Sequence, residues 1–142
     1  NYAQPRIPQL LQQGVLKGMY KFRPAPKKHK MRAQILGSAA MMNHALQAQE
    51  LLSEKYKVAA DVWSVTSYKE LHRDAMETER WNLLHPDEGT RQSYIAQCFD
   101  GEEGVIVASS DYVKALPESV AQAFGRLVVS LGTYVYGRSE SR

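Results

Sequence analysis

The sequence predicts an α/β protein, with a three-layer α/β/α fold and a mostly parallel sheet. Short apolar runs alternate with segments of helical period along most of the 142 residues, and this order implies right-handed crossovers between parallel strands. Runs such as residues 104–110 (GVIVASS) and 126–132 (RLVVSLG) are largely apolar, which is typical of strands buried on both faces. An apolar content of 44% in a chain of this length suits one domain with its own core.

The predicted strands follow in order from the N-terminus. Residues 1–13 contain two prolines and no clear period, so we expect a linker or arm before a domain that occupies residues 14–142. Alternating or continuous apolar runs predict strands at residues 14–22, 31–38, 56–66, 104–110 and 126–132.

The predicted helices fill the intervals between these strands. A helix is expected over residues 39–55, where apolar side chains recur at helical spacing. Ser67 followed by Glu70 matches a capping box, so a second helix begins there and ends before Pro86. Residues 94–99 (YIAQCF) fit a strand or a helical turn. A last helix is expected over residues 112–124, with Asp111 as its cap and Pro117 within it.

Charge and cysteine content exclude several classes of protein. The net charge is +3, and the dense basic cluster at residues 26–32 (PKKHKMR) has no interleaved aromatic side chains, so we expect a solvated loop and no nucleic-acid partner. Cys98 is the one cysteine, which rules out an intrachain disulfide and fits a reducing, cytoplasmic compartment. No stretch approaches the roughly 18 apolar residues of a membrane span, so we expect no membrane partner.

Candidate catalytic residues do not form a recognisable set. The four histidines are not spaced as metal ligands, and no serine lies in the nucleophile pattern of hydrolases. The turn at residues 37–38 joins a strand to a helix N-terminus, a place where anions can bind, but the glycine-rich phosphate-binding patterns are absent. We therefore expect no catalytic, cofactor-binding or metal-binding residue in this chain.

The segment at residues 77–86 (ETERWNLLHP) is the strongest candidate for a binding surface. It places Arg80, Trp81 and Asn82 near the end of a polar helix. Trp and Arg are favoured anchors at protein interfaces, so these three residues are predicted interface positions. The alternative, in which Trp81 covers the domain's own core, is equally open at this point.

Four segments carry a resemblance to a known family. In chain order they are residues 61–86 (DVWSVTSYKELHRDAMETERWNLLHP), 93–97 (SYIAQ), 105–120 (VIVASSDYVKALPESV) and 131–142 (LGTYVYGRSESR). They resemble the C-terminal part of the homodimeric, bacterial-type pyruvate dehydrogenase first component, a thiamine-diphosphate-dependent enzyme of the transketolase superfamily. Where the family usually reads LGTDGFGRSDSR, this chain has Tyr134 and Val135 in place of Asp-Gly.

The resemblance implies a transketolase C-terminal-like domain over residues 14–142. It is truncated at its C-terminal end, because the family continues into a further helix and strand. The family's thiamine diphosphate and magnesium are bound by preceding domains, so no cofactor is expected in this fragment, which alone would be inactive. The implied parent activity is that of an oxidoreductase, which decarboxylates pyruvate and reductively acetylates a lipoyl group on the path from glycolysis to acetyl-CoA.

The resemblance also implies partners within a cytoplasmic multienzyme complex. These are the homodimer partner, the preceding thiamine-binding domains and the dihydrolipoyl acetyltransferase core. The polar end of the chain then joins the predicted interface, and the added positions are Gly137, Arg138, Ser139 and Arg142. Two alternatives stay open. One is a stand-alone regulatory module that binds an anion or nucleotide at the turn of residues 37–38, and the other is the same domain of another 2-oxo acid dehydrogenase or of a transketolase.

Overall fold

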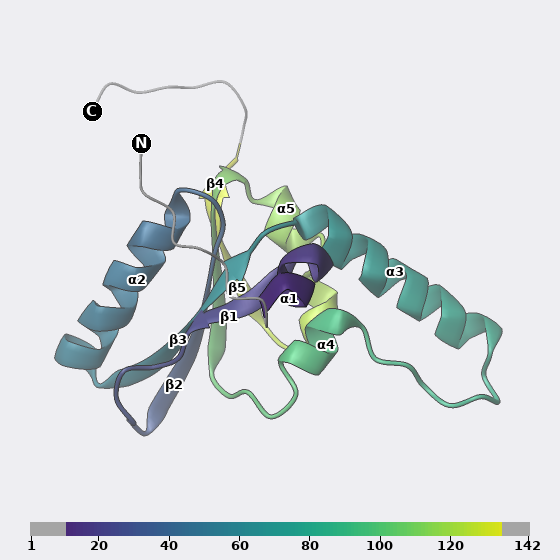
Figure 1. The fold of residues 1–142 in the computed structure, drawn as a ribbon, viewed down its shortest axis with the longest axis horizontal. Coiled ribbons are helices and arrows are strands. Elements are labelled where there is room, and N and C mark those ends of the chain that lie inside the picture. The colour runs from purple at the N-terminus through teal and green to yellow at the C-terminus, as the bar shows by residue number, and fades with distance from the viewer. Residues whose placement is uncertain (1–10, 135–142) are drawn as a thin grey trace.

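The computed structural model describes residues 11–134 and has the predicted layers around a central sheet (Figure 1). The sheet has five strands in the order β1-β3-β2-β4-β5. The strands are β1 (Met19–Arg23), β2 (Met31–Gly37), β3 (Val58–Val65), β4 (Val105–Val113) and β5 (Val128–Thr133). Strand β1 pairs antiparallel with β3, and the other pairs are parallel, which confirms the mostly parallel sheet.

Helices cover the two faces of the sheet unequally. One face carries α2 (Met41–Leu51), which continues into the π-helical turn η2 (Leu52–Tyr56). The other face carries α1 (Gln12–Lys17), α3 (Tyr68–Leu84), α4 (Tyr94–Cys98), α5 (Ala115–Glu118) and the 3₁₀ helix η3 (Ala121–Phe124) (Figure 1). The segment that fitted a strand or a helical turn is therefore the helix α4, which Ser93 caps by accepting a hydrogen bond from the Ala96 N–H.

The larger core lies between the sheet and the α3 side. Its aromatic centre is Phe99, whose ring stacks on Trp63 at a centroid distance of 4.7 Å and meets Phe124 edge-on at 5.0 Å. The Trp63 indole N–H donates to Gln34 Oε1 at 2.7 Å, so this buried polar group is satisfied. A smaller core lies under α2 and is built from Ala33, Ile35, Ala45, Ala60 and Val62.

A buried carboxylate with two half-buried cations lies at the edge of the larger core. Asp61 on β3 is 2% exposed. It accepts hydrogen bonds from the Ala25 N–H at 2.8 Å, from Arg32 at 2.9 Å and from Lys21 Nζ at 3.3 Å. Burial by itself raises the pKa of the Asp61 carboxyl, but the Ala25 hydrogen bond and the charges of Lys21 and Arg32 outweigh burial, and the net pKa is lowered. The cluster ties β1 and β2 to β3, the strand that lies between them.

The predicted strand over residues 14–22 is wrong in its first half. Residues 12–17 form the helix α1, and the strand β1 begins at Met19. Gly18 makes this change of direction, because it adopts φ 107° and its N–H bonds to the Gly14 carbonyl at 3.1 Å. The predicted division between residues 13 and 14 falls within α1, and the linker and the domain boundary remain predictions.

The predicted helix over residues 112–124, with Asp111 as its cap, is also wrong. Strand β4 continues to Val113, so Asp111 lies in a strand. The Lys114 N–H donates to the Thr133 carbonyl at 3.0 Å, which extends the pairing with β5 past a register shift. Only two short turns follow, and Pro117 lies in the first of them, where its missing N–H costs no hydrogen bond.

Strand β5 is an edge strand and is not buried on both faces as predicted. Leu127 just before it is 76% exposed, and Leu131 within it is 53% exposed. Val129 and Leu131 are paired with β4 residues on the face that carries α2, and none of the described helices covers them there. Within residues 11–134, one face of this apolar strand is therefore open to solvent.

Candidate protein–protein interface

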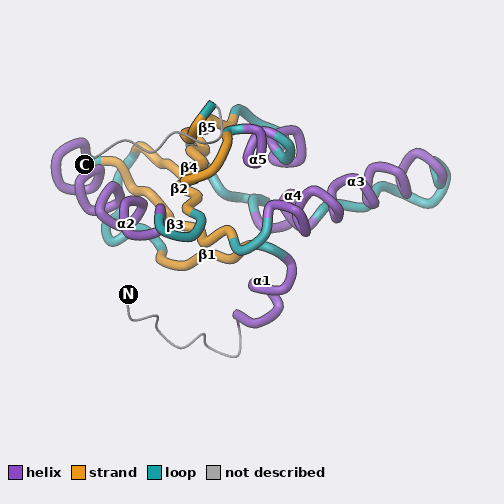
Figure 2. Tube along the Cα trace, turned by 90° about the horizontal axis from the view of Figure 1, so that it is seen from above, coloured by secondary structure: helices purple, strands orange, loops and turns teal. Residues whose placement is uncertain are grey.

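Helix α3 carries the predicted interface residues away from the body of the domain. Ser67 caps it by accepting a hydrogen bond from the Glu70 N–H at 3.2 Å, as predicted. The Ser67 N–H donates to the Gly18 carbonyl at 3.1 Å, so the reciprocal half of the capping box is replaced by a tertiary contact. Only Tyr68 and Leu71 are buried, both in the first turn. The later turns project beyond the strands (Figure 2).

Trp81 forms a stack at the outer end of α3. Its ring lies parallel to that of His85, with a centroid distance of 4.5 Å and an interplanar angle of 10°. The Arg91 guanidinium lies over the same ring, 3.5 Å from its centroid. Trp81 is half-buried in these contacts and is not among the core residues under the sheet. The alternative in which Trp81 covers the domain's own core is therefore wrong.

Asn82 closes the loop that follows α3. Its side-chain amide donates to the Arg91 carbonyl at 3.0 Å, and its side-chain carbonyl accepts from the Arg91 N–H at 2.8 Å. This pair of bonds returns the loop of residues 86–93 to the helix. The α3 tip, defined as residues 76–91, is thus held together by Trp81 and Asn82 acting from inside it.

The remaining predicted interface residues have different positions. Arg80 is exposed and forms no ion pair with another residue of the described part of the chain. Glu77, three residues before Arg80 on α3, does not pair with it there, because Glu77 lies 3.9 Å from Arg73, which also pairs with Glu70. Gly137, Arg138, Ser139 and Arg142 lie outside the described residues.

Exposed apolar side chains distinguish the α3 tip from an ordinary solvated helix. Leu83 is 76% exposed, Leu84 is 64% exposed and Met76 is 56% exposed. Single leucines exposed on a protein surface are common. Three large apolar side chains within three turns of a projecting helix, however, favour contact with another protein. These residues and Arg91 were not predicted. The four-residue spacing of Trp81 and His85 is a signal that predicts their stack, whereas no local pattern predicts the path that brings Arg91 back to the helix.

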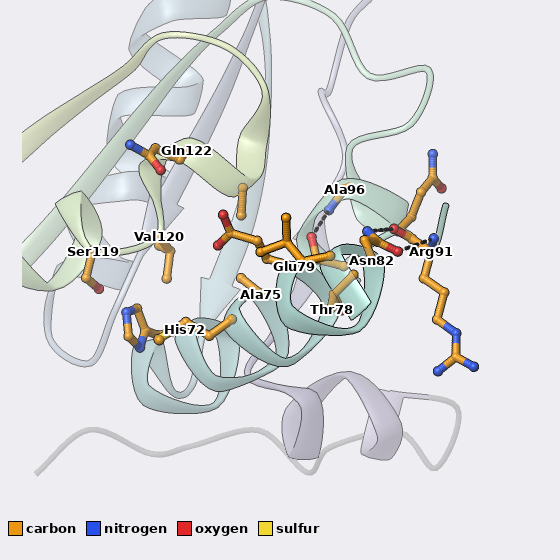
Figure 3. A pocket seen from close by; sticks show the side chains of 15 residues that line it. His72, Ala75, Thr78, Glu79, Asn82, Arg91, Ala96, Ser119, Val120 and Gln122 are labelled. Atoms are coloured by element: carbon orange, nitrogen blue, oxygen red, sulfur yellow. Dashed lines mark hydrogen bonds between the residues drawn. The ribbon is translucent and has the colours of Figure 1, made fainter. Parts of the chain in front are cut away.

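A groove of about 660 Å³ runs beside α3 (Figure 3). One wall is the face of α3 that carries His72, Met76 and Glu79, and the opposite wall is the segment with Val120 and Gln122. Small side chains, including Ala75, Ala96 and Ala123, also line it. The exposed apolar side chains Met76 and Leu83 of α3 line this groove. A concave surface of this kind suits a segment of protein better than a reacting small molecule.

The described part of the chain offers little else with chemical reactivity. Within residues 11–134, no three or more His, Cys, Asp or Glu side chains are grouped so as to hold a metal ion. Burial raises the pKa of the Cys98 thiol, and the thiol is half-buried beside Tyr94, so it is a weak nucleophile at neutral pH. None of the helices in the described part of the chain is long and apolar enough to cross a membrane.

The turn at residues 37–38 leads into a helix without a side-chain cap. Helix α2 begins at Met41, two residues later than predicted, because Ala39 adopts a left-handed φ of 46°. Ser38 contributes only its carbonyl, which accepts from the Met41 N–H at 3.0 Å. No charged side chain lies in the turn itself, so the arrangement adds nothing specific to the anion-binding alternative.

Comparisons with known proteins agree with the geometry. The family described as the transketolase-like TK C-terminal domain matches residues 18–142. The pyruvate dehydrogenase E1 component of Pseudomonas aeruginosa is 40% identical over 143 residues, covering 100% of this chain and 16% of the relative. The proteins of the same name from Escherichia coli K12 and Mycolicibacterium smegmatis are each 41% identical, covering 100% and 99% of this chain.

The chain spans only about 16% of the length of the curated relatives that it matches. The match nevertheless extends over almost all of the chain and includes β1 to β5 and the α3 tip. Together with the mostly parallel five-stranded sheet, it shows that this chain belongs to the transketolase-like C-terminal domain family.

Proposed function

We propose that this chain is the C-terminal domain of a thiamine-diphosphate-dependent pyruvate dehydrogenase first component. The supporting observation is an identity of 40% to 41% along the whole chain to proteins that share that one name. In this proposal the complete enzyme decarboxylates pyruvate and passes the acetyl group to a lipoyl group in the cytoplasm. This domain contributes to packing and assembly and does not take part in the chemistry.

The thiamine cofactor does not fit the residues described here. Diphosphate bound through Mg²⁺ needs carboxylate or other oxygen ligands around the metal, and no suitable group of His, Cys, Asp or Glu occurs within residues 11–134. We therefore assign no step of thiamine chemistry to this chain. The preceding domains of the longer enzyme are proposed to hold the cofactor.

The α3 tip is proposed as the surface that joins this domain to the rest of the enzyme. It projects from the domain and exposes Leu83 and Leu84, while Trp81 and Asn82 keep its shape. Arg80 and the polar positions Gly137, Arg138, Ser139 and Arg142 are proposed to contact the partner subunit or the acetyltransferase core. The surroundings of the tip are mixed in charge, which suits a specific protein partner better than a polyanion.

A chimeric enzyme tests this function. The segment of the Escherichia coli relative that matches this chain is replaced by residues 1–142, and pyruvate decarboxylation is measured with an artificial electron acceptor. We expect a soluble dimer that binds thiamine diphosphate and retains decarboxylation, because the cofactor site lies elsewhere. A chimera that is folded and cofactor-bound but inactive or monomeric would contradict the proposal.

Charge reversal in the same chimera tests the proposed contacts. Arg80→Glu and Arg138→Glu are expected to weaken dimerisation or assembly with the acetyltransferase core, measured by sedimentation velocity. Lys69→Glu is the matched control, because it makes the same change of charge at an exposed position in the first turn of α3, away from the α3 tip. Unchanged dimerisation and unchanged assembly in both test variants would remove Arg80 and Arg138 from the interface.

The alternative, a stand-alone anion-binding module, makes an opposite prediction. Calorimetry of the 142-residue chain with nucleotides and with thiamine diphosphate separates the two functions. Clear micromolar binding would favour the module. Its absence, together with an active chimera, would favour a domain of the dehydrogenase.

A further inference from the structure

We propose that Arg91 is the anchor of the α3 tip and that its guanidinium binds the carboxylate of an Asp or Glu in a protein segment outside residues 1–142. The inference rests on the proposed function, because it assumes that the tip meets another part of the enzyme. It adds the chemical identity of the group that the tip recognises.

The Arg91 side chain is positioned before any partner arrives. Its guanidinium lies 3.5 Å from the centroid of the Trp81 ring, and His85 stacks on Trp81 at 4.5 Å. Its backbone is held at both the N–H and the carbonyl by Asn82, at 2.8 Å and 3.0 Å. A side chain fixed at both ends loses little conformational entropy when it binds, so the interaction retains most of its free energy.

The hydrogen-bonding edge of Arg91 is unused within the described part of the chain. Its guanidinium forms no hydrogen bond or ion pair with another residue of the range 11–134, although Asp87 and Glu88 lie in the same loop. Arg73, on the same helix as Trp81, differs in this respect, because it pairs with both Glu70 and Glu77. Arg91 is therefore held by an aromatic ring while its donors remain available.

The chemistry of this arrangement favours a carboxylate. A guanidinium that stacks on an aromatic face directs its N–H groups outward in its own plane, parallel to the ring, and a carboxylate accepts two of them in parallel. A phosphate accepts in the same way, but a nucleic acid or another polyanion would meet Glu79, Asp87 and Glu88 around the tip. A single acidic side chain with apolar neighbours fits both Arg91 and the exposed Leu83 and Leu84.

Carbodiimide cross-linking of the chimeric enzyme tests the proposal directly. Arg91→Lys replaces the guanidinium with an amine that the reagent condenses with a carboxylate in contact, and mass spectrometry identifies the residue joined to position 91. We expect an isopeptide link to an Asp or Glu outside the 142 residues. Adding Trp81→Leu to Arg91→Lys is expected to reduce that link several-fold, because the ring that positions the side chain is gone.

Arg73→Lys is the matched control, since its carboxylate partners Glu70 and Glu77 are known. It is expected to give links within α3 whether or not Trp81 is present. Links from position 91 only to Asp87, Glu88 or Glu79, or no link while position 73 reacts, would overturn the proposal. Because the chimera's decarboxylation is measured on the same samples, an active enzyme without the external link overturns this inference and leaves the proposed function standing.

Discussion

The side-chain amide of Asn82 satisfies both backbone hydrogen-bonding groups of Arg91, with the Arg91 N–H donating at 2.8 Å and the Arg91 carbonyl accepting at 3.0 Å. This relationship joins the last turn of α3 to a residue nine positions later in a loop. The shape of the tip therefore depends on a pair of hydrogen bonds that a single substitution removes.

Asn82→Ala is expected to release the loop of residues 86–93 from α3. Each lost hydrogen bond is partly replaced by water at this exposed site, so the expected cost is about 1 kcal/mol. Amide hydrogen exchange at Arg91 should become about fivefold faster, while exchange in β3 stays unchanged. Asn43→Ala, at an exposed position on α2, is the control. Unchanged exchange at Arg91 would contradict the role given to Asn82.

Asp61→Asn is expected to destabilise the domain because it leaves Lys21 and Arg32 without their buried partner. Both cations stay 31% exposed, so water can replace part of the interaction, and the expected loss is about 2 kcal/mol rather than the larger cost of a fully buried pair. Urea denaturation at neutral pH measures it. Glu50→Gln is the control, because the Arg23–Glu50 pair is on the surface and its loss should cost less than about 0.5 kcal/mol. Equal effects of the two substitutions would contradict this prediction.

The same carboxyl predicts part of the acid sensitivity of the fold. Burial opposes ionisation of Asp61, but the Ala25 N–H, Lys21 and Arg32 lower its pKa in the folded state. Its contribution to stability is therefore present above the unfolded pKa of about 3.9 and is lost as the pH falls through the lower folded pKa. Denaturation midpoints measured from about pH 6 to pH 2 should fall less steeply for Asp61→Asn than for the parent chain. Parallel curves would show that Asp61 titrates normally.

Tyr68→Phe is expected to keep or raise the stability of the domain. The Tyr68 hydroxyl is buried and has no hydrogen-bond partner within residues 11–134, so its removal relieves an unsatisfied group, a gain of up to about 1 kcal/mol. Burial raises the pKa of Tyr68 above the unfolded value of about 10, so the parent loses stability as the pH rises above 10, and this variant should lose less. Tyr94→Phe is the matched comparison. The Tyr94 hydroxyl donates to the Met19 carbonyl at 2.8 Å, and its loss should cost about 1 kcal/mol.

Two glycines in the turn before β4 provide a test of the local backbone. A Cβ on Gly104 would lie 2.1 Å from the Arg32 carbonyl oxygen, and φ is 96° there, so Gly104→Ala should prevent the β2–β4 pairing. A Cβ on Gly101 would meet nothing within 4 Å, so Gly101→Ala should cost only the strain of φ 75°, roughly 1 kcal/mol. Thermal unfolding distinguishes the two. Similar melting temperatures would contradict the close approach at Gly104.

The parts of the fold that sequence predicted well are those where local pattern and tertiary packing agree. Strands β2 and β3 and helix α3 lie within two residues of their predicted ends, because each combines a strong period with a capping or turn residue. The strand predicted from residue 14 was wrong in its first half because the helix over residues 12–17 has too few turns to show a period, and it ends only at Gly18. The helix expected after Asp111 was wrong because pairing with β5 extends β4, and such pairing is not visible locally.

The candidate site likewise contains residues that the sequence predicted and residues that it did not. Trp81 and Asn82 stand out by residue type, so composition alone selected them. Their partner Arg91 lies nine residues beyond Asn82 in a loop without a period, and its position is set by a hydrogen-bonded return of the chain. The ion pairs of Asp61 could not be predicted for another reason. A single acidic residue within an apolar strand does not indicate which cationic side chains will pair with it.

Strand β5 has a consequence for the life of this polypeptide in a cell. Val129 and Leu131 lie open on the α2 side of the sheet, and Val105 is exposed on the same side. Chaperones and quality-control proteases select apolar strands that are accessible in this way, because such strands mark incomplete folding. The abundance of the protein should therefore depend on how accessible that face is, and a substitution such as Leu131→Thr should prolong its half-life more than any change within the buried core.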